Sequence, residues 1–356
     1  MSLAVQGQGV KTPRGSKMAA VSEQIGITDV NISYGRPAVN GREGKIWGDL
    51  VPYGFVDYHY GTSKAAPWRA GANENTTIEF STDVTIEGRP LAAGKYGFFI
   101  AMGQEKATLV FSKDNNAWGS FYYNPAGDAL RVDVPVMKTT ESVERLKYEF
   151  GSETDSSAVA MLEWERVKIP FTVSVDLKKT QVDAYRHAFN SGEFYEYWQN
   201  MQQAADFCLE NNVNLEEGLS WADRSINTWF GEANFRTLST YAGLLDVAGR
   251  RREADSVMKL AYPKGNTRDI YFYGARLLRM KKNKEALAAF KINYDRTPKD
   301  WLTNLGMAKG YAAMGDKTAA IKYADASQQL VEDKGTKDYV GRVKQGITDG
   351  KDVSRL

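Results

Sequence analysis

Apolar and polar residues alternate with a period of two in short runs along the first half of the chain. Val30, Ile32 and Tyr34, for example, alternate with polar neighbours. Successive side chains of a β-strand point to opposite faces, so each run predicts a strand that buries one face. About ten such runs, separated by turn residues at spacings of roughly 8–15 residues, predict an antiparallel β-sandwich or barrel. The later runs are 108–111, 119–123, 130–134, 146–150, 158–164 and 168–175.

After residue 176 the apolar spacing changes to i, i+3 and i+4, which predicts amphipathic helices. These helices repeat, because Gly274 and Ala308 are 34 positions apart and Ala286 and Ala320 are too. Small residues at such positions let paired helices approach, and large residues fill the spaces between them. The pattern resembles the tetratricopeptide repeat. Its three copies contain Ala242, Leu245, Gly249, Ala254 and Ala261; then Gly274, Ala286, Phe290 and Pro298; then Ala308, Tyr311, Gly315 and Ala320.

The change of period divides the chain into parts of different class. We expect a flexible N-terminal tail at 1–22, a β-sandwich domain at 23–177 and a helical-repeat domain at 178–356. The expected fold class is therefore an antiparallel β-sandwich or barrel followed by a helical array that resembles tetratricopeptide repeats. Two interpretations of the array remain open. It either supplies a groove for a protein or peptide partner, or only supports the β domain.

Composition narrows the function classes. The chain has 46 basic and 44 acidic side chains, a formal charge of +2, which argues against a nucleic-acid surface. Cys208 is the single cysteine, so neither an intrachain disulfide nor a multi-cysteine metal site can form. No apolar run is long enough to predict a transmembrane segment. We expect an exported protein, periplasmic or in the cell envelope, whose signal peptide has been removed from this sequence.

Several strings of the first half resemble a bacterial family known as domain of unknown function 2911. They are ISYGRPAVNGREGKIWGDLVPYG, WRAGANENTTIEFSTDVTIEGRPLAAGKYGFFI, FSKDNNAWGSFYYNPAGDALRVDV and AMLEWERVKIPF, and the resemblance covers residues 25–175. The resemblance implies an exported protein with following helical repeats, and the family has no established activity that could be carried over to this chain. The chain departs from the family pattern by inserting DYHYGTSKAAP at 57–67.

The best candidate ligand site is a polar cluster that includes an arginine beside a carboxylate. Such a pair offers donors and acceptors to an anion or a sugar. The same groups also tie loops together at the end of a sandwich, and we favour this structural interpretation. The candidate ligand-binding residues are Arg36, Trp68, Arg69, Asn73, Glu74, His59 and Tyr122.

The insertion supplies an alternative, a hydrolase acting on a glycan or an ester. Glu74, Asp57 and His59 would be its acid and base groups. The chain has only two histidines and no serine in a nucleophile-elbow motif, so we expect no catalytic residue, no metal site and no cofactor. We therefore expect a non-catalytic binding or scaffold protein that recognises a peptide, a glycan or a partner protein. Tyr122 would stack on a sugar ring or a peptide if its side chain is exposed.

Overall fold

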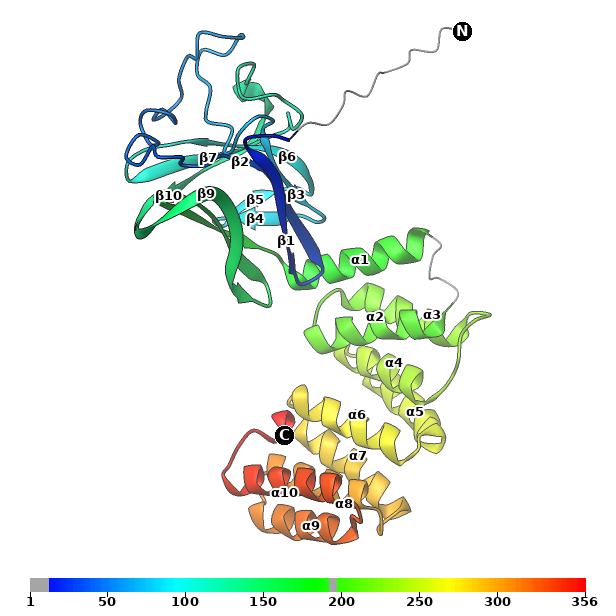
Figure 1. The fold of residues 1–356 in the computed structure, drawn as a ribbon. Coiled ribbons are helices and arrows are strands. Elements are labelled where there is room, and N and C mark those ends of the chain that lie inside the picture. The colour runs from blue at the N-terminus through cyan, green and yellow to red at the C-terminus, as the bar shows by residue number, and fades with distance from the viewer. Residues whose placement is uncertain (1–12, 192–196) are drawn as a thin grey trace. The chain divides into compact units, whose positions relative to one another are not determined.

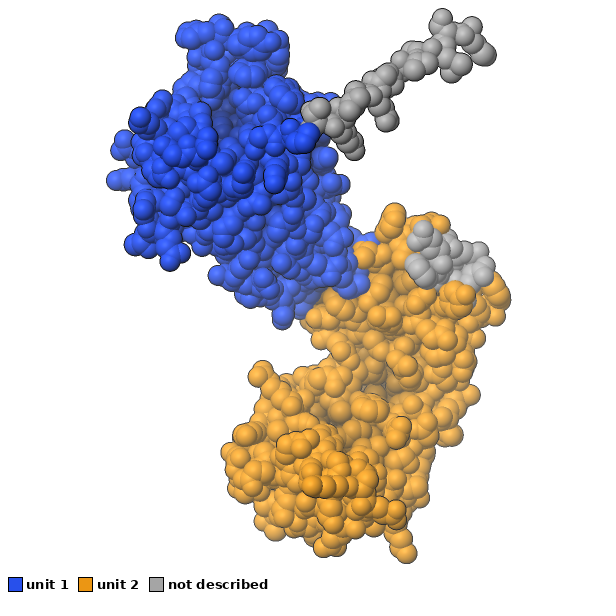
Figure 2. Space-filling model, in the orientation of Figure 1, with its two compact units in different colours: residues 1–183 blue, residues 184–356 orange. Residues whose placement is uncertain are grey.

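The computed structural model describes residues 13–191 and 197–356, and it divides into two compact units, residues 1–183 and 184–356 (Figure 2). Of the expected tail at 1–22, residues 1–12 lie outside the described residues, whereas residues 17–22 form part of the first strand. This strand exists because Val21 faces the core as a partly buried residue and the backbone pairs along the next strand. The boundary between the units falls within the first helix, after Asp183.

The first unit contains two antiparallel sheets (Figure 1). Their strand orders, β1-β2-β3-β6-β7-β8 and β5-β4-β10-β9, do not form a closed barrel within the described part of the chain. The larger sheet consists of β1 (Lys17–Ile25), β2 (Thr28–Arg36), β3 (Thr76–Phe80), β6 (Gly94–Ala101), β7 (Lys106–Ser112) and β8 (Asp128–Pro135). The smaller sheet consists of β4 (Val84–Ile86), β5 (Arg89–Leu91), β9 (Met137–Thr154) and β10 (Ser157–Ser174).

The two sheets share one apolar core. Val30 and Ile32 of β2 are fully buried, while Asn31 between them is partly exposed, as the period of two predicts. Phe98 of β6 in the larger sheet and Phe171 of β10 in the smaller sheet have ring centroids 5.5 Å apart. The core therefore lies between the inner faces of both sheets. The loops that join the strands can hold polar side chains, because most of the apolar core comes from the strands.

β10 is one strand of 18 residues where the sequence predicts two. Its break is a bulge at Glu165, whose φ is +51° and around which the pairing register with β9 shifts. Leu162 and Trp164 are buried before the bulge, and Val167 and Ile169 are buried after it. The Glu165 carboxylate accepts hydrogen bonds from the backbone N–H groups of residues 44 and 166, and it thereby holds the loop at 41–48.

The prediction of a strand at 119–123 is wrong, because this segment forms turns. Gly119 has a φ of +76°, which ends the extended backbone directly after an isolated bridge between Trp118 and Glu74. The aromatic residues of this loop therefore do not alternate between two faces of a sheet.

Ten helices follow the sheets in the described residues, and they form successive antiparallel pairs (Figure 1). None of them is long and apolar enough to cross a membrane, within the described residues. The helices are α1 (Leu177–Ser191), α2 (Trp198–Asn211), α3 (Leu215–Asn227), α4 (Phe235–Val247), α5 (Arg251–Ala261), α6 (Thr267–Arg279), α7 (Asn283–Arg296), α8 (Trp301–Ala313), α9 (Lys317–Leu330) and α10 (Lys334–Thr348).

The three predicted repeats correspond to the pairs α4–α5, α6–α7 and α8–α9. Phe290 of α7 is fully buried, and an added Cβ at Gly274 of α6 would lie 2.4 Å from its ring. An added Cβ at Gly306 of α8 would lie 2.6 Å from the same ring. One large side chain thus fills the space left by small residues of two helices, which is the packing that the repeat pattern predicts.

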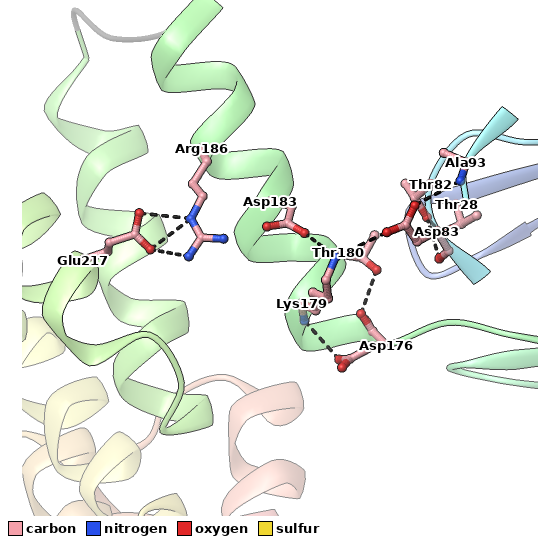
Figure 3. A network of polar contacts seen from close by, with 10 residues as sticks. All are labelled: Thr28, Thr82, Asp83, Ala93, Asp176, Lys179, Thr180, Asp183, Arg186 and Glu217. Carbon is pink, nitrogen blue, oxygen red and sulfur yellow. Dashed lines mark hydrogen bonds and ion pairs between the residues drawn. The ribbon is translucent and has the colours of Figure 1, made fainter. Parts of the chain in front are cut away.

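Polar contacts fix the start of α1 on the first unit (Figure 3). The Asp176 carboxylate accepts a hydrogen bond from the backbone N–H of Lys179 at 3.0 Å, which satisfies one of the free donors of the first turn. The Lys179 ammonium pairs with Asp183 at 2.8 Å and with Asp83 at 3.6 Å. Within the second unit, Arg186 of α1 forms a charged pair with Glu217 of α3.

Candidate functional site

The structure brings Arg69 and Asn73 together at one end of the first unit. A guanidinium Nη1 of Arg69 donates to the main-chain oxygen of Asn73 at 2.9 Å, and that oxygen also accepts from the N–H of Gly119. Asn73 has a φ of +68°, a conformation that asparagine tolerates better than most residues. The guanidinium lies 5.2 Å from the ring centre of Phe121, and burial lowers the pKa of Arg69. These contacts tie two loops together.

The partner of Glu74 is Arg14, a residue that the sequence did not mark as a candidate. Both carboxylate oxygens of Glu74 accept from a guanidinium nitrogen of Arg14, each at 2.8 Å. Burial raises the pKa of Glu74, but its own backbone N–H and the Arg14 guanidinium outweigh this effect and the net pKa is lowered. Glu74 is therefore held as an anion, which favours ion pairing over general-acid catalysis.

Arg36 and Trp68 have structural contacts. The Arg36 guanidinium donates to the main-chain oxygen of Leu146 at 2.8 Å. Trp68 is 7% exposed and stacks on Trp164 with ring centroids 6.1 Å apart. A ligand cannot stack on a ring that both its neighbours and the core already cover, so Trp68 contributes to packing.

In the insertion, Asp57 pairs with its own neighbours. Its carboxylate accepts from the backbone N–H of His59 at 2.8 Å and lies 3.1 Å from the Lys64 ammonium. These two partners, His59 first, lower the pKa of Asp57. The His59 imidazole is 88% exposed and 3.7 Å from Asp57. In the described residues, the hydrogen bonds and ion pairs of Glu74 include neither of them, so no contact supports the hydrolase alternative.

Exposed aromatic rings gather where the insertion meets the loop at 118–123. Tyr60 is 63% exposed and Tyr122 is 60% exposed, and their ring centroids lie 6.5 Å apart. Tyr60 also contacts Phe121, and Trp118 of the same loop is 59% exposed. We call Tyr60, Trp118, Phe121 and Tyr122 the aromatic loop surface. Tyr122 is therefore exposed, as a stacking role requires.

The second unit contains a groove of about 450 Å³ along α2, α4 and α6, the first helices of three successive pairs. Phe272 of α6 lies in this groove and is 64% exposed, although it is a large apolar residue. We call this site the helical groove. Its lining consists of Gln202, Asp206, Glu210, Phe235, Arg236, Ser239, Asn266, Arg268, Asp269, Phe272, Tyr273, Arg276 and Arg279.

A buried polar network supports the wall of the helical groove. Arg276 is 8% exposed and pairs with the Asp206 carboxylate, which also accepts from the hydroxyl of Thr240 at 2.5 Å. The same guanidinium contacts the Thr240 hydroxyl at 3.2 Å and lies 5.6 Å from the ring centre of Tyr273. A buried charge needs such partners, and here they join α2, α4 and α6. The network therefore holds the three helices of the groove in one arrangement.

The sequence did not lead to a prediction of the residues that line the helical groove. A usable signal was present, because Arg236 and Arg268 both occupy the second position of the first helix in a pair, and Phe272 is one turn further along α6. Aligning the repeats by position would have shown that Arg236, Arg268 and Phe272 lie on the same face of the helical array.

Solved structures that match include "Crystal structure of YrrB: a TPR protein with an unusual peptide-binding site", with 16% identity over 49% of this chain and 88% of that chain, at a TM-score of 0.26. "Crystal structure of MamA" matches with 10% identity over 46% and 92%, at a TM-score of 0.29. "MamA 41-end from Desulfovibrio magneticus RS-1" matches with 19% identity over 43% and 90%, at a TM-score of 0.24.

No curated protein matches the chain. For the first unit, the matching family model is the one described as protein of unknown function (DUF2911). Its match covers residues 16–173, and the resemblance predicted from the motifs of the β domain is thereby confirmed.

Proposed function

We propose that this protein binds a partner protein, and that the helical groove holds an extended segment of that partner. The observation that carries the proposal is the exposed ring of Phe272 inside a groove of about 450 Å³. A large apolar side chain left open to water in a concave site is typical of a surface that another molecule covers. The groove crosses three helices, a geometry that suits an extended peptide.

Rigid walls support this function, because a preorganised groove loses less conformational entropy on binding. The pair between Arg276 and Asp206 and the hydroxyl of Thr240 connect the three helices. A binding partner thus meets a groove whose shape the buried contacts already determine.

Selection from a displayed library of random peptides on the full chain tests this function. Peptides enriched on the native protein should bind the Phe272→Ala variant at least about fivefold more weakly, since truncating an anchor side chain of an interface costs more than about 1 kcal/mol. Leu260→Ala is the matched control, because Leu260 of α5 is also 64% exposed and does not line the groove. No enrichment, or equal binding by the Phe272→Ala variant, would refute the groove as the binding site.

The aromatic loop surface supports a second function, glycan binding by the first unit. Sugar rings stack on exposed aromatic faces, and Tyr60 and Tyr122 offer two neighbouring rings. A glycan array probed with the native protein and a Tyr60→Ala/Tyr122→Ala variant tests it. The signal should disappear in this variant and persist in Trp229→Ala, which removes a 79% exposed ring from the second unit. A signal that both variants retain would exclude the surface.

A further inference from the structure

We infer that the segment bound in the helical groove is acidic, with carboxylates on either side of an apolar residue that packs on Phe272. This inference rests on the function proposed above and specifies the chemistry of the partner. It follows from the charges of the groove after the internal ion pairs are subtracted.

Each acidic side chain of the groove has a cationic or backbone partner. Asp206 pairs with Arg276, and Glu210 lies 3.3 Å from Arg279. The Asp269 carboxylate accepts from the backbone N–H of the residue that caps α6, at 3.1 Å. Two of the three carboxylates of the lining are therefore paired with an arginine, and the third caps α6, so the four arginines leave the lining a net charge of +1.

Two of the four arginines have no such partner. Among the described residues, the Arg236 and Arg268 guanidinium groups take part in no hydrogen bond or ion pair, and both residues are exposed. Both line the same groove as Phe272. The groove therefore offers two free cations and one exposed phenyl ring, which is complementary to acidic side chains around an apolar one.

The second unit already holds one segment in this way. Val353 lies in the apolar core of α6 to α10 at 9% exposure, and the carboxylate of Asp352 before it is 2.7 Å from the Lys281 ammonium. Further on, the buried Lys309 of α8 donates to the main-chain oxygen of Leu356 at 2.9 Å. Cations and an apolar contact on these helices thus hold Asp352 and the short 3-10 helix Val353–Arg355 that follows it.

The site of this internal segment and the helical groove share one helix, α6. Burial lowers the pKa of Lys309, and Arg279, which lines the groove, lowers it further through charge repulsion. Two positions that share α6 therefore carry cations beside apolar contacts. One is filled by residues 352–356, and the other contains the free Arg236 and Arg268.

The amino-acid composition of selected peptides tests the charge. Peptides enriched on the native full chain should contain several-fold more Asp and Glu than the starting library. An Arg236→Glu/Arg268→Glu variant should enrich Lys and Arg instead. Arg252→Glu is the matched control, because Arg252 is also the second residue of its helix, α5, and lies outside the groove. It should select the same acidic peptides as the native protein.

Circular dichroism checks that the variants are folded, and the charge-reversed variant should melt at or above the native temperature, because glutamate suits a helix N-terminus better than arginine. Selected peptides that are neutral or basic, or an unchanged preference in the reversed variant, would overturn the inference. If such peptides still lose affinity for Phe272→Ala, the groove binds a partner and only the acidic chemistry is wrong. If no peptide depends on Phe272, the proposed function itself fails.

Discussion

The substitution Gly274→Ala probes how the helical repeats pack. In an exposed helix, replacing Gly by Ala stabilises the folded state by roughly 1 kcal/mol, because alanine loses less backbone entropy on folding. At Gly274 the added Cβ would lie 2.4 Å from the Phe290 ring, which is much closer than carbon atoms approach. The ring has little room to move away, since it is fully buried and Gly306 and Gly310 of α8 also lie next to it.

Overpacking of a filled core costs about 1–3 kcal/mol. A contact of 2.4 Å predicts a cost near the upper end of this range, which exceeds the gain in helix propensity, so we expect Gly274→Ala to lower the free energy of unfolding by up to about 2 kcal/mol. Urea unfolding followed by circular dichroism at the helical band measures the change. The same substitution at Gly341 of α10 is the control, because its added Cβ would meet only the flexible end of the Gln328 side chain. Gly341→Ala should stabilise the protein.

A double-mutant cycle identifies the cause. Phe290→Leu shortens the side chain, so it should destabilise the native protein but relieve part of the cost of Gly274→Ala, with a coupling energy of at least about 0.5 kcal/mol. The reasoning is refuted if Gly274→Ala stabilises the chain as Gly341→Ala does, or if the two changes at Gly274 and Phe290 are additive.

Three further predictions concern single groups. Burial raises the pKa of the Cys208 thiol to about 11, so an aromatic disulfide reagent at pH 8 should modify it many times more slowly in the native protein than in denaturant. Burial raises the pKa of Asp246, but Lys282 and then Arg251 outweigh it and the net pKa is lowered. This stabilisation is present above the ordinary aspartate pKa of about 4 and is lost as the pH falls through the lower folded value, so Asp246→Asn should flatten the acid limb of a stability curve. Arg276→Ala leaves the Asp206 charge without its cation, and thermal melting should show a loss of about 3–5 kcal/mol, whereas Arg279→Ala, which removes an exposed pair, should change stability by less than about 1 kcal/mol.

Periodicity alone predicted most of the fold. The alternation of Val30, Ile32 and Tyr34 corresponds to β2, and the 34-residue spacing of Gly274 and Ala308 corresponds to α6 and α8. These features depend on local spacing, which a sequence shows directly. The prediction of a strand at 119–123 was wrong because Gly119, with a positive φ, ends the extended backbone. The alternation of residue types does not show the backbone conformation of a single residue.

The candidate sites were harder to predict, because they depend on partners far apart in the chain. Glu74 is near Arg69 in sequence but pairs with Arg14, and Trp68 was a candidate ligand-binding residue although its ring stacks on Trp164. Whether the Arg236 guanidinium has an ion-pair partner depends on which residues the fold places beside it. Residue type and spacing show which groups exist, whereas the tertiary contacts determine which of them remain free to bind.

The bulge in β10 shifts the alternation of buried and exposed positions along the strand by one residue. Buried positions are even-numbered up to Trp164 and odd-numbered from Val167, so the single extra residue, Glu165, changes the phase of every side chain that follows. Removing Glu165 would leave an unbroken alternation with the same inward residues. The core does not require this residue. The loop at 41–48 does, because the Glu165 carboxylate bonds to it. Glu165 thus connects β10 to that loop without belonging to the alternating apolar positions of the strand. An alignment of related sequences should therefore allow a one-residue gap at position 165.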